Sequence, residues 1–197
     1  MRTIHVEKIL ETIATKYEPF SQEVDFQYRF ADEILEQYPG SHVFLECLPY
    51  PSASSVRVDI CVIYGDKRYL FELKYKVRNQ AVDLSCYDYV KDIRKIEKLN
   101  GMSKDFSGFA IFLTNRSIFW RGSDNTTSNY YPFQLKDGNE LKGTLDWQGN
   151  REKKGEGRQD PIQLDGRYRL KWTDYCKAPI QRCKKGNQKL RYLIVSI

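Results

Sequence analysis

The stretch "RVDICVIYGDKRYLFELKYK", residues 57 to 76, constrains the fold most, because it predicts two neighbouring antiparallel strands. Side chains alternate between the two faces of a strand, so the apolar residues at the even positions 56 to 64 share one face. The odd positions 69 to 77 form an equivalent apolar face in the second run. Gly65-Asp66 suits a two-residue hairpin turn, since glycine accepts a positive φ and aspartate bonds its own backbone.

The opposite face of this predicted hairpin carries charges. Pairing Tyr64 with Lys67 places Asp59 directly across from Glu72, with Lys74 on the same face. Like charges opposed across a ladder destabilise it, and a bound divalent cation would remove the repulsion. Magnesium takes one or two carboxylates together with water and phosphate, and a neighbouring lysine can stabilise a transition state. The alternative is a solvated face with surface ion pairs, each worth about 0 to 1 kcal/mol.

The spacing of these residues resembles a known motif. Asp59, twelve intervening residues and then Glu72-Leu73-Lys74 resemble the metal-binding motif of the PD-(D/E)XK nuclease superfamily, which includes many restriction enzymes and Holliday-junction resolvases. Val58 stands where the motif's name has proline. The resemblance implies that Asp59, Glu72 and Lys74 are catalytic, and that Asp59 and Glu72 hold Mg²⁺ or Mn²⁺.

A further acidic or polar group often supports this kind of site. Glu46 lies on the strand that precedes the hairpin, among apolar neighbours, where a carboxylate needs a partner or a metal. Glu33 lies on the helix before that strand, and Gln80 follows the hairpin. Glu46 and Glu33 are therefore the two further metal-ligand candidates, and Gln80 is a supporting candidate.

The order of predicted elements extends the resemblance over residues 21 to 120. Apolar residues recur at helical spacing in two N-terminal helices and in a helix over residues 86 to 99. In the second of these helices the predicted apolar stripe is Val24, Tyr28, Ala31, Leu35 and Tyr38. "HVFLECL" and the hairpin supply three strands, and "GFAIFLTN" reads as a strand buried on both faces. The order is similar to the αβββαβ core of the superfamily and predicts an α/β fold with a mixed central sheet flanked by helices.

The remainder of the chain, residues 121 to 197, reads as a β-rich elaboration of the same domain. A chain of 197 residues can bury one sizeable core, so we expect residues 1 to 197 to form a single domain. A hairpin is predicted around Asp137-Gly138, and "GRYRLKW" and "KLRYLIVSI" read as further strands.

The basic residues are concentrated in the C-terminal part. Residues 1 to 150 carry a net charge of −2 and residues 151 to 197 a net charge of +8. Such asymmetry favours a surface for nucleic acid, because Lys and Arg near a phosphate backbone release condensed counterions, although a solubilising face would have the same composition. The candidate nucleic-acid contacts are Arg94, Lys95, Arg182, Lys184 and Lys185.

Several classes of protein fit the sequence poorly. It contains no apolar run of membrane-spanning length, and its start lacks the apolar core of a signal peptide, so a cytoplasmic protein without a membrane partner is expected. Five scattered cysteines without a CxxC pair argue against a zinc site or a disulfide framework. There is no GxGxxG motif and no phosphate-binding loop.

Two functions of different classes remain. The first is a metal-dependent nuclease that hydrolyses phosphodiester bonds of DNA, in restriction, repair or defence against mobile DNA. The second is a non-catalytic nucleic-acid-binding or protein-interaction module that retains the nuclease fold. The sequence leaves open whether the chain forms a homodimer.

Overall fold

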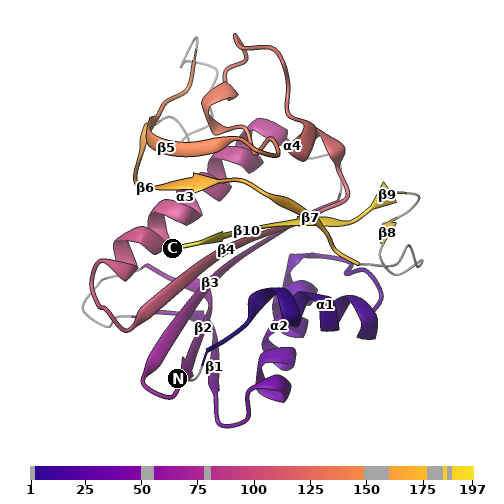
Figure 1. Cartoon of the computed structure of the whole chain (residues 1–197), viewed down its shortest axis with the longest axis vertical. Helices are drawn as coiled ribbons and strands as arrows, with labels where there is room; N and C mark the ends of the chain where they lie inside the picture. The colour runs from indigo at the N-terminus through magenta and orange to yellow at the C-terminus, as the bar shows by residue number, and fades with distance from the viewer. Residues whose placement is uncertain (1–2, 50–55, 78–80, 149–159, 177–183, 186–187) are drawn as a thin grey trace.

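The computed structural model describes residues 3–49, 56–77, 81–148, 160–176, 184–185 and 188–197. A six-stranded mixed sheet with the strand order β1-β2-β3-β4-β10-β7 forms its centre (Figure 1). Its strands are β1 (His42–Cys47), β2 (Val58–Tyr64), β3 (Lys67–Lys76), β4 (Phe106–Thr114), β7 (Trp172–Asp174) and β10 (Arg191–Ser196). β3 and β4 are parallel, and the other neighbours in this sheet are antiparallel.

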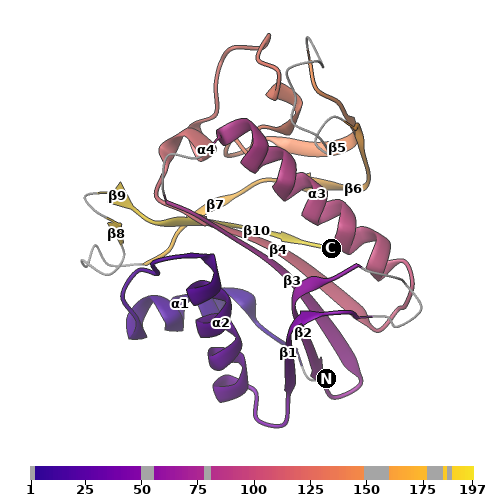
Figure 2. The same cartoon turned by 180° about the vertical axis from the view of Figure 1, so that it is seen from behind.

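Helices cover both faces of this sheet (Figures 1 and 2). The helices α1 (Val6–Lys16) and α2 (Glu23–Gln37) pack on one face, where they bury Phe71, Leu73 and their neighbours. The helix α3 (Val82–Asn100) connects the parallel strands β3 and β4 and packs on the opposite face. Gly108 of β4 permits this approach, because a Cβ at this position would lie 1.9 Å from Cγ2 of Ile96. The chain is therefore an α/β protein with a mixed sheet flanked by helices, as predicted.

The C-terminal residues contribute to the central sheet and to a separate layer. β10 pairs with β4, so the end of the chain lies inside the main sheet. The remaining elements are α4 (Ser117–Arg121), a 3₁₀ turn (Tyr131–Phe133), β5 (Glu140–Leu145), β6 (Ile162–Arg169), β8 (Lys184–Lys185) and β9 (Gln188–Lys189). β5 and β6 form a two-stranded sheet that packs against α3 in the second core, and β8 and β9 form a short hairpin.

Glu97 of α3 joins this extra layer to the rest of the molecule. Its carboxylate accepts hydrogen bonds from the backbone N–H of Asp165 at 3.0 Å and of Gly166 at 2.7 Å, and from the hydroxyl of Tyr168 at 2.9 Å. Arg94 lies one turn earlier on α3 and pairs with both Glu97 and Asp165. The β5–β6 sheet is therefore attached to α3 through charged groups as well as through apolar packing.

The buried face of α2 differs from the predicted stripe. Of the predicted stripe, Ala31 and Tyr38 are buried but Val24, Tyr28 and Leu35 are exposed. The helix instead buries a row that includes Phe26 and Phe30. Both rows have helical spacing in the sequence, and the row with two phenylalanines buries more apolar area. The helix predicted over residues 86 to 99 is confirmed as part of α3, which buries its apolar row of Cys86, Tyr89, Ile93, Ile96 and Leu99, and α1 likewise buries Val6, Ile9, Leu10 and Ile13.

Two further expectations were wrong. No hairpin forms around Asp137-Gly138 within residues 129–148, because the segment before them makes a 3₁₀ turn at Tyr131–Phe133. The Asp137 carboxylate instead accepts a hydrogen bond from the N–H of Trp172, and β5 pairs with β6. Cys176 is disulfide-bonded, although the scattered cysteines did not predict a disulfide. Cys47, Cys61 and Cys86 are free thiols.

In the part of the chain that the structure describes, no helix combines the length and the apolar composition needed to span a bilayer.

Candidate functional site

The predicted pair of carboxylates lies on the face of the β2–β3 hairpin that α3 covers. Tyr64 pairs with Lys67 and Ile60 with Phe71, and the ladder ends there, so Asp59 and Glu72 are the next residue of each strand beyond the last pair. The charge of Asp59 acts on Glu72, so the two carboxylates lie near each other. Glu72 forms an ion pair with a lysine of α3, and Lys74 forms one with an aspartate of α3. The structure therefore brings the three residues of the motif to one face, as the alternation of side chains predicts.

Glu72 is the most buried member of this group. Its exposed fraction is 2%, so its carboxylate is almost completely removed from water. Burial is the main cause that raises its pKa to about 9, and the negative charges of Asp92 and Asp59 add to the shift, while Lys95 opposes it. A buried carboxylate with a raised pKa lies where positive charge is insufficient for its ionisation.

The Asp59 carboxylate bonds a backbone N–H of β3 at the point where the pairing of β2 with β3 ends. Its Oδ2 atom accepts a hydrogen bond of 2.7 Å from the N–H of Leu73. Burial raises the pKa of Asp59, while this hydrogen bond and the charge of Lys74 lower it in part. Asp59 remains half-buried, so its carboxylate is less restricted than that of Glu72.

Glu23 has an equivalent role two residues farther along β3. This first residue of α2 accepts a 2.8 Å hydrogen bond from the N–H of Tyr75 and lies 3.4 Å from the ammonium of Lys76. β2 begins at Val58, so this part of β3 extends beyond its neighbour. Carboxylates therefore line the edge of β3 at the end that carries Lys74.

Lys74 is held from the helix side. Its Nζ atom lies 3.1 Å from Oδ2 of Asp92 on α3. Burial lowers the pKa of Lys74, but the charges of Asp92 and Glu23 raise it by more, so the net shift is upward. The side chain consequently stays an ammonium group at neutral pH and presents a fixed positive charge beside the carboxylates.

Lys95, one turn after Asp92, brings a second ammonium group to the same place. Its Nζ atom lies 2.5 Å from Oε1 of Glu72 and 3.8 Å from Oδ1 of Asp92, and it donates a 3.0 Å hydrogen bond to the carbonyl oxygen of Arg57. Asp59, Glu72, Lys74, Asp92 and Lys95 are hereafter called the carboxylate–lysine cluster.

The cluster offers two ligand carboxylates for a divalent cation. Oε1 of Glu72 and Oδ2 of Asp92 are buried without a geometrically satisfactory hydrogen bond, although each lies within ion-pair distance of a lysine. Among the described residues, no three His, Cys, Asp or Glu side chains are grouped so that they could hold a metal together. Two carboxylates suffice for magnesium, which commonly keeps several waters, so Asp59 and Glu72 fit this ion.

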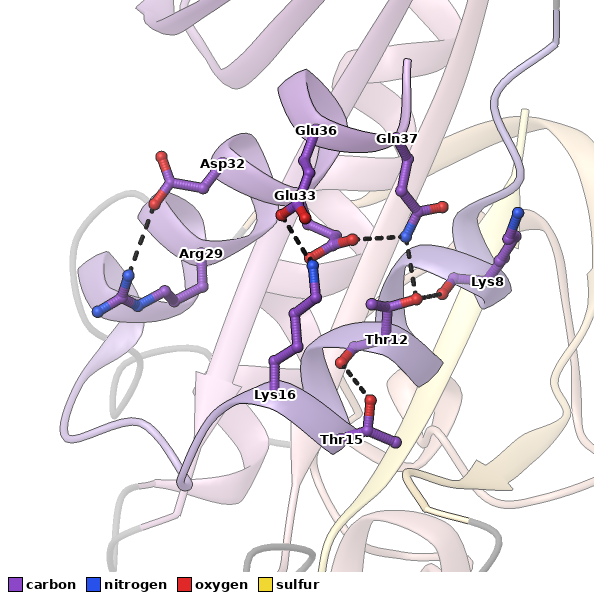
Figure 3. Close-up of polar contacts among 9 residues, drawn as sticks. All are labelled: Lys8, Thr12, Thr15, Lys16, Arg29, Asp32, Glu33, Glu36 and Gln37. Atoms are coloured by element: carbon purple, nitrogen blue, oxygen red, sulfur yellow. Dashed lines mark hydrogen bonds and ion pairs between the residues drawn. The ribbon is translucent and has the colours of Figure 1, made fainter. Parts of the chain in front are cut away.

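Glu33, one of the additional candidates, lies elsewhere. Its side chain is fully buried between α1 and α2, where Oε2 pairs with the ammonium of Lys16 at 2.9 Å and Oε1 accepts a 2.7 Å hydrogen bond from Gln37 (Figure 3). Lys16 also pairs with Glu36 at 2.7 Å. The structure therefore places Glu33 in a helix-to-helix network and does not bring it to the cluster.

The other candidates have varied positions. The side chain of Glu46 is exposed at the end of β1, and its backbone has a φ of 48°. Arg94 and Lys95 both have ion-pair partners within the protein. The described residues include neither Gln80 nor Arg182, and of Lys184 and Lys185 only the backbone, as strand β8, is described.

Asp92 of the cluster and the neighbouring Glu23 were not predicted from the sequence. Asp92 occupies a buried position of α3, between Tyr89 and Ile96 on the apolar face, and an acidic residue at such a position is a usable signal for a buried ion pair. Glu23 gave no comparable signal, because acidic residues are common in the first turn of any helix.

The chain matches no protein-family model, and its comparison with curated proteins and with solved structures likewise found no match.

Proposed function

We propose that this protein is a metal-dependent nuclease with a restriction-endonuclease-like αβββαβ core, and that it hydrolyses phosphodiester bonds of DNA. One observation carries the proposal: the buried carboxylate of Glu72 lies near the Asp59 carboxylate, and the ammonium of Lys74 lies near Asp59 as well. The order of α2, β1, β2, β3, α3 and β4 along the chain agrees with that core.

Four residues of the cluster have a role in this proposal. Asp59 and Glu72 would hold Mg²⁺ or Mn²⁺, which supplies a bound water of lowered pKa and neutralises charge on the scissile phosphate. Lys74 presents an ammonium group to the phosphate, where it stabilises the negative charge that develops in the transition state. Asp92 positions Lys74 from the helix side, through the 3.1 Å ion pair.

The position of the basic hairpin supports DNA as the substrate. Lys76, at the end of β3, pairs with Thr114 of β4, and Thr114 pairs with Arg191 of β10. The hairpin β8–β9 directly precedes β10 in the chain. It therefore lies at the end of the sheet where β3 and β4 end and β10 begins. A duplex bound there would contact the C-terminal basic residues while its backbone approaches the cluster.

A specific observation favours the second candidate, a binding module without catalysis. Both lysines of the cluster already form ion pairs, Lys74 with Asp92 and Lys95 with Glu72. A cluster whose lysines are both paired within the protein resembles a structural ion-pair network that connects a helix to a sheet. The two candidates differ in one measurable respect, because only the nuclease needs a divalent cation at Asp59 and Glu72.

The deciding experiment is cleavage of supercoiled, linear and branched DNA with Mg²⁺ or Mn²⁺. We expect metal-dependent cleavage by the wild type and none by Asp59→Asn. Asp66→Asn is the matched control, because Asp66 is exposed in the turn of the same hairpin and asparagine suits that turn equally well. Equal cleavage by Asp59→Asn and the wild type would contradict the proposal.

A further inference from the structure

Lys95 occupies the position where positive charge is most needed in the cluster. Its ammonium group contacts the carboxylate of Glu72 at 2.5 Å and the carbonyl oxygen of Arg57 at 3.0 Å, and Asp92 lies 3.8 Å away. Two carboxylates and a carbonyl oxygen are the oxygen types that bind hard divalent cations. The ammonium of Lys95 therefore has oxygen contacts of the kind that a metal ion would have.

Lys74 does not compete for this position, because Asp92 holds it on the other side. Lys74 contacts Oδ2 of Asp92, whereas Lys95 approaches Oδ1 of the same carboxylate. The two ammonium groups thus lie at different positions: that of Lys74 contacts Asp92, and that of Lys95 contacts Glu72. Only the place of Lys95 coincides with a ligand atom of the proposed cation.

We infer that Lys95 is an internal counter-ion, which pairs with the ionised form of Glu72 when no metal is bound and which must leave Glu72 for a divalent cation to bind. This inference rests on the proposed function, because it concerns the cation that Asp59 and Glu72 would hold. An ammonium 2.5 Å from Oε1 of Glu72 occupies the space and the lone pair that a metal bond to the same oxygen requires. Two cations at one carboxylate oxygen would also repel each other.

The side chain of Lys95 has the freedom to leave. Its exposed fraction is 27%, compared with 2% for Glu72, so its flexible four-carbon chain has access to solvent. Residues with long stems and a charged end can move the charge outward while the stem stays packed. The displaced ammonium would then be available to a phosphate group beside the cluster, which accounts for a lysine in preference to a fixed hydrogen-bond donor.

A purely structural role for Lys95 predicts a different result. In that case the ion pair connects α3 to β3, and removal of the lysine destabilises the protein without a gain in metal affinity. An internal counter-ion predicts that removal of the lysine strengthens metal binding. The two roles are separated by metal affinity measured without DNA.

The first experiment is calorimetric titration of the full chain with Mg²⁺, at about pH 8.5 so that protons compete less for the carboxylates. We expect Lys95→Met to bind Mg²⁺ about tenfold more tightly than the wild type, or better. Lys91→Met is the matched control, because Lys91 is exposed one turn earlier on the same helix, and it should bind like the wild type. An affinity of Lys95→Met equal to or weaker than that of the wild type overturns the inference.

A second experiment uses the wild type and does not depend on the folding of a variant. Acetylation of each lysine is followed by mass spectrometry with and without Mg²⁺, in the absence of DNA. Mg²⁺ should raise the labelling of Lys95 several-fold and leave that of Lys91 unchanged, because a displaced ammonium reaches solvent. Labelling of Lys95 that does not respond to bound Mg²⁺ overturns the inference.

The results also distinguish this inference from the proposed function. If the wild type cleaves DNA with Mg²⁺ but Lys95→Met binds Mg²⁺ no more tightly, the counter-ion role is wrong and the nuclease proposal stands. If neither protein binds Mg²⁺ and neither cleaves DNA, the proposed function itself is wrong, and the inference with it.

Discussion

The ammonium of Lys74 lies 3.1 Å from the carboxylate of Asp92, so the lysine of the motif on β3 is positioned by a residue of α3. The strand supplies the charge, and the helix fixes its direction. The cluster therefore depends on the packing of α3 against the sheet. Variants of the strand residue and of the helix residue test this dependence.

Asp59→Asn should separate metal binding from metal-free stability. Asparagine can still accept the hydrogen bond from Leu73, and it removes the repulsion between the Asp59 and Glu72 carboxylates. We expect a metal-free melting temperature at least equal to that of the wild type, and little response to Mg²⁺. In the wild type, Mg²⁺ at about a hundred times its Kd should add about 2.7 kcal/mol to the free energy of unfolding. Calorimetric melting with and without Mg²⁺ checks both expectations, and an unchanged Mg²⁺ response in Asp59→Asn would contradict them.

Lys74→Ala should retain the Mg²⁺-dependent rise in melting temperature and lose DNA cleavage. The lysine is proposed to act on the transition state, and both ligand carboxylates remain in the variant. Melting with and without Mg²⁺ together with a plasmid-nicking assay tests this. Full nicking activity in Lys74→Ala would show that the lysine is not part of a catalytic site.

Asp92→Asn should lower stability by about 1 to 3 kcal/mol, since it leaves the largely buried ammonium of Lys74 without its charged partner. Lys74→Met alone should also destabilise the protein, because Asp92 is then left unpaired. The double variant Lys74→Met/Asp92→Asn should lose less stability than the sum of the two single changes. Urea unfolding of the four proteins gives this coupling, and strictly additive losses would mean that the two groups do not interact in solution.

The metal-free protein should lose stability as the pH rises from about 4.5 to about 9. Burial raises the pKa of Glu72 from 4.5 to about 9 in the folded state, so between these values the folded state binds more protons than the unfolded state. The free energy of unfolding then falls with increasing pH. Between about pH 6 and pH 8 we expect a loss of about 1 to 3 kcal/mol in EDTA, which Glu72→Gln should reduce. Urea unfolding at both pH values tests the slope, and an equal slope in Glu72→Gln would assign it to other groups.

Neutralisation of Arg182, Lys184 and Lys185 should weaken DNA binding and reduce its dependence on salt. Each lost phosphate contact lowers the number of counterions that binding releases. A matched triple variant of Lys91, Lys98 and Lys104 removes the same charge from α3 and the turn that follows it. Fluorescence anisotropy over a range of salt concentrations compares the two. If both triple variants have the same effect, the C-terminal residues contribute only net charge.

Glu33→Gln should lower stability by about 1 to 3 kcal/mol and leave the Mg²⁺ response unchanged. The change weakens the contact of Glu33 with Lys16 but keeps the shape of the side chain in the network between α1 and α2 (Figure 3). Melting with and without Mg²⁺ again provides the test. Loss of the Mg²⁺ response would place Glu33 among the metal ligands after all.

The strand features were readable from the sequence because alternation has a period of two residues. A shift of one residue would expose the whole apolar face, so the turn at Gly65-Asp66 determines the register and with it the face on which Glu72 and Lys74 lie. The buried strand β4 was equally clear, since the continuous apolar run of "GFAIFLTN" allows few other interpretations.

Helix faces and long-range pairs were harder to predict. In α2 two apolar rows compete, and the choice between them depends on which row meets the sheet, as the burial of Phe26 and exposure of Tyr28 demonstrate. The contacts of Asp92 with Lys74 and of Glu23 with Tyr75 join residues 18 and 52 positions apart. Local spacing carries no information on such pairs, because they depend on how α2 and α3 pack on the sheet.

The bonds of Glu97 to β6 have a consequence for the cluster. Asp92, Lys95 and Glu97 lie within two turns of α3, so a shift of this helix along the sheet would break the hydrogen bonds of Glu97 to Asp165, Gly166 and Tyr168. The C-terminal layer therefore holds in place the helix that carries two of the five charged groups of the cluster. A change that loosens β6 would move those charges without altering any residue of the cluster. The C-terminal strands therefore help to position the charged groups of the site as well as to complete the fold.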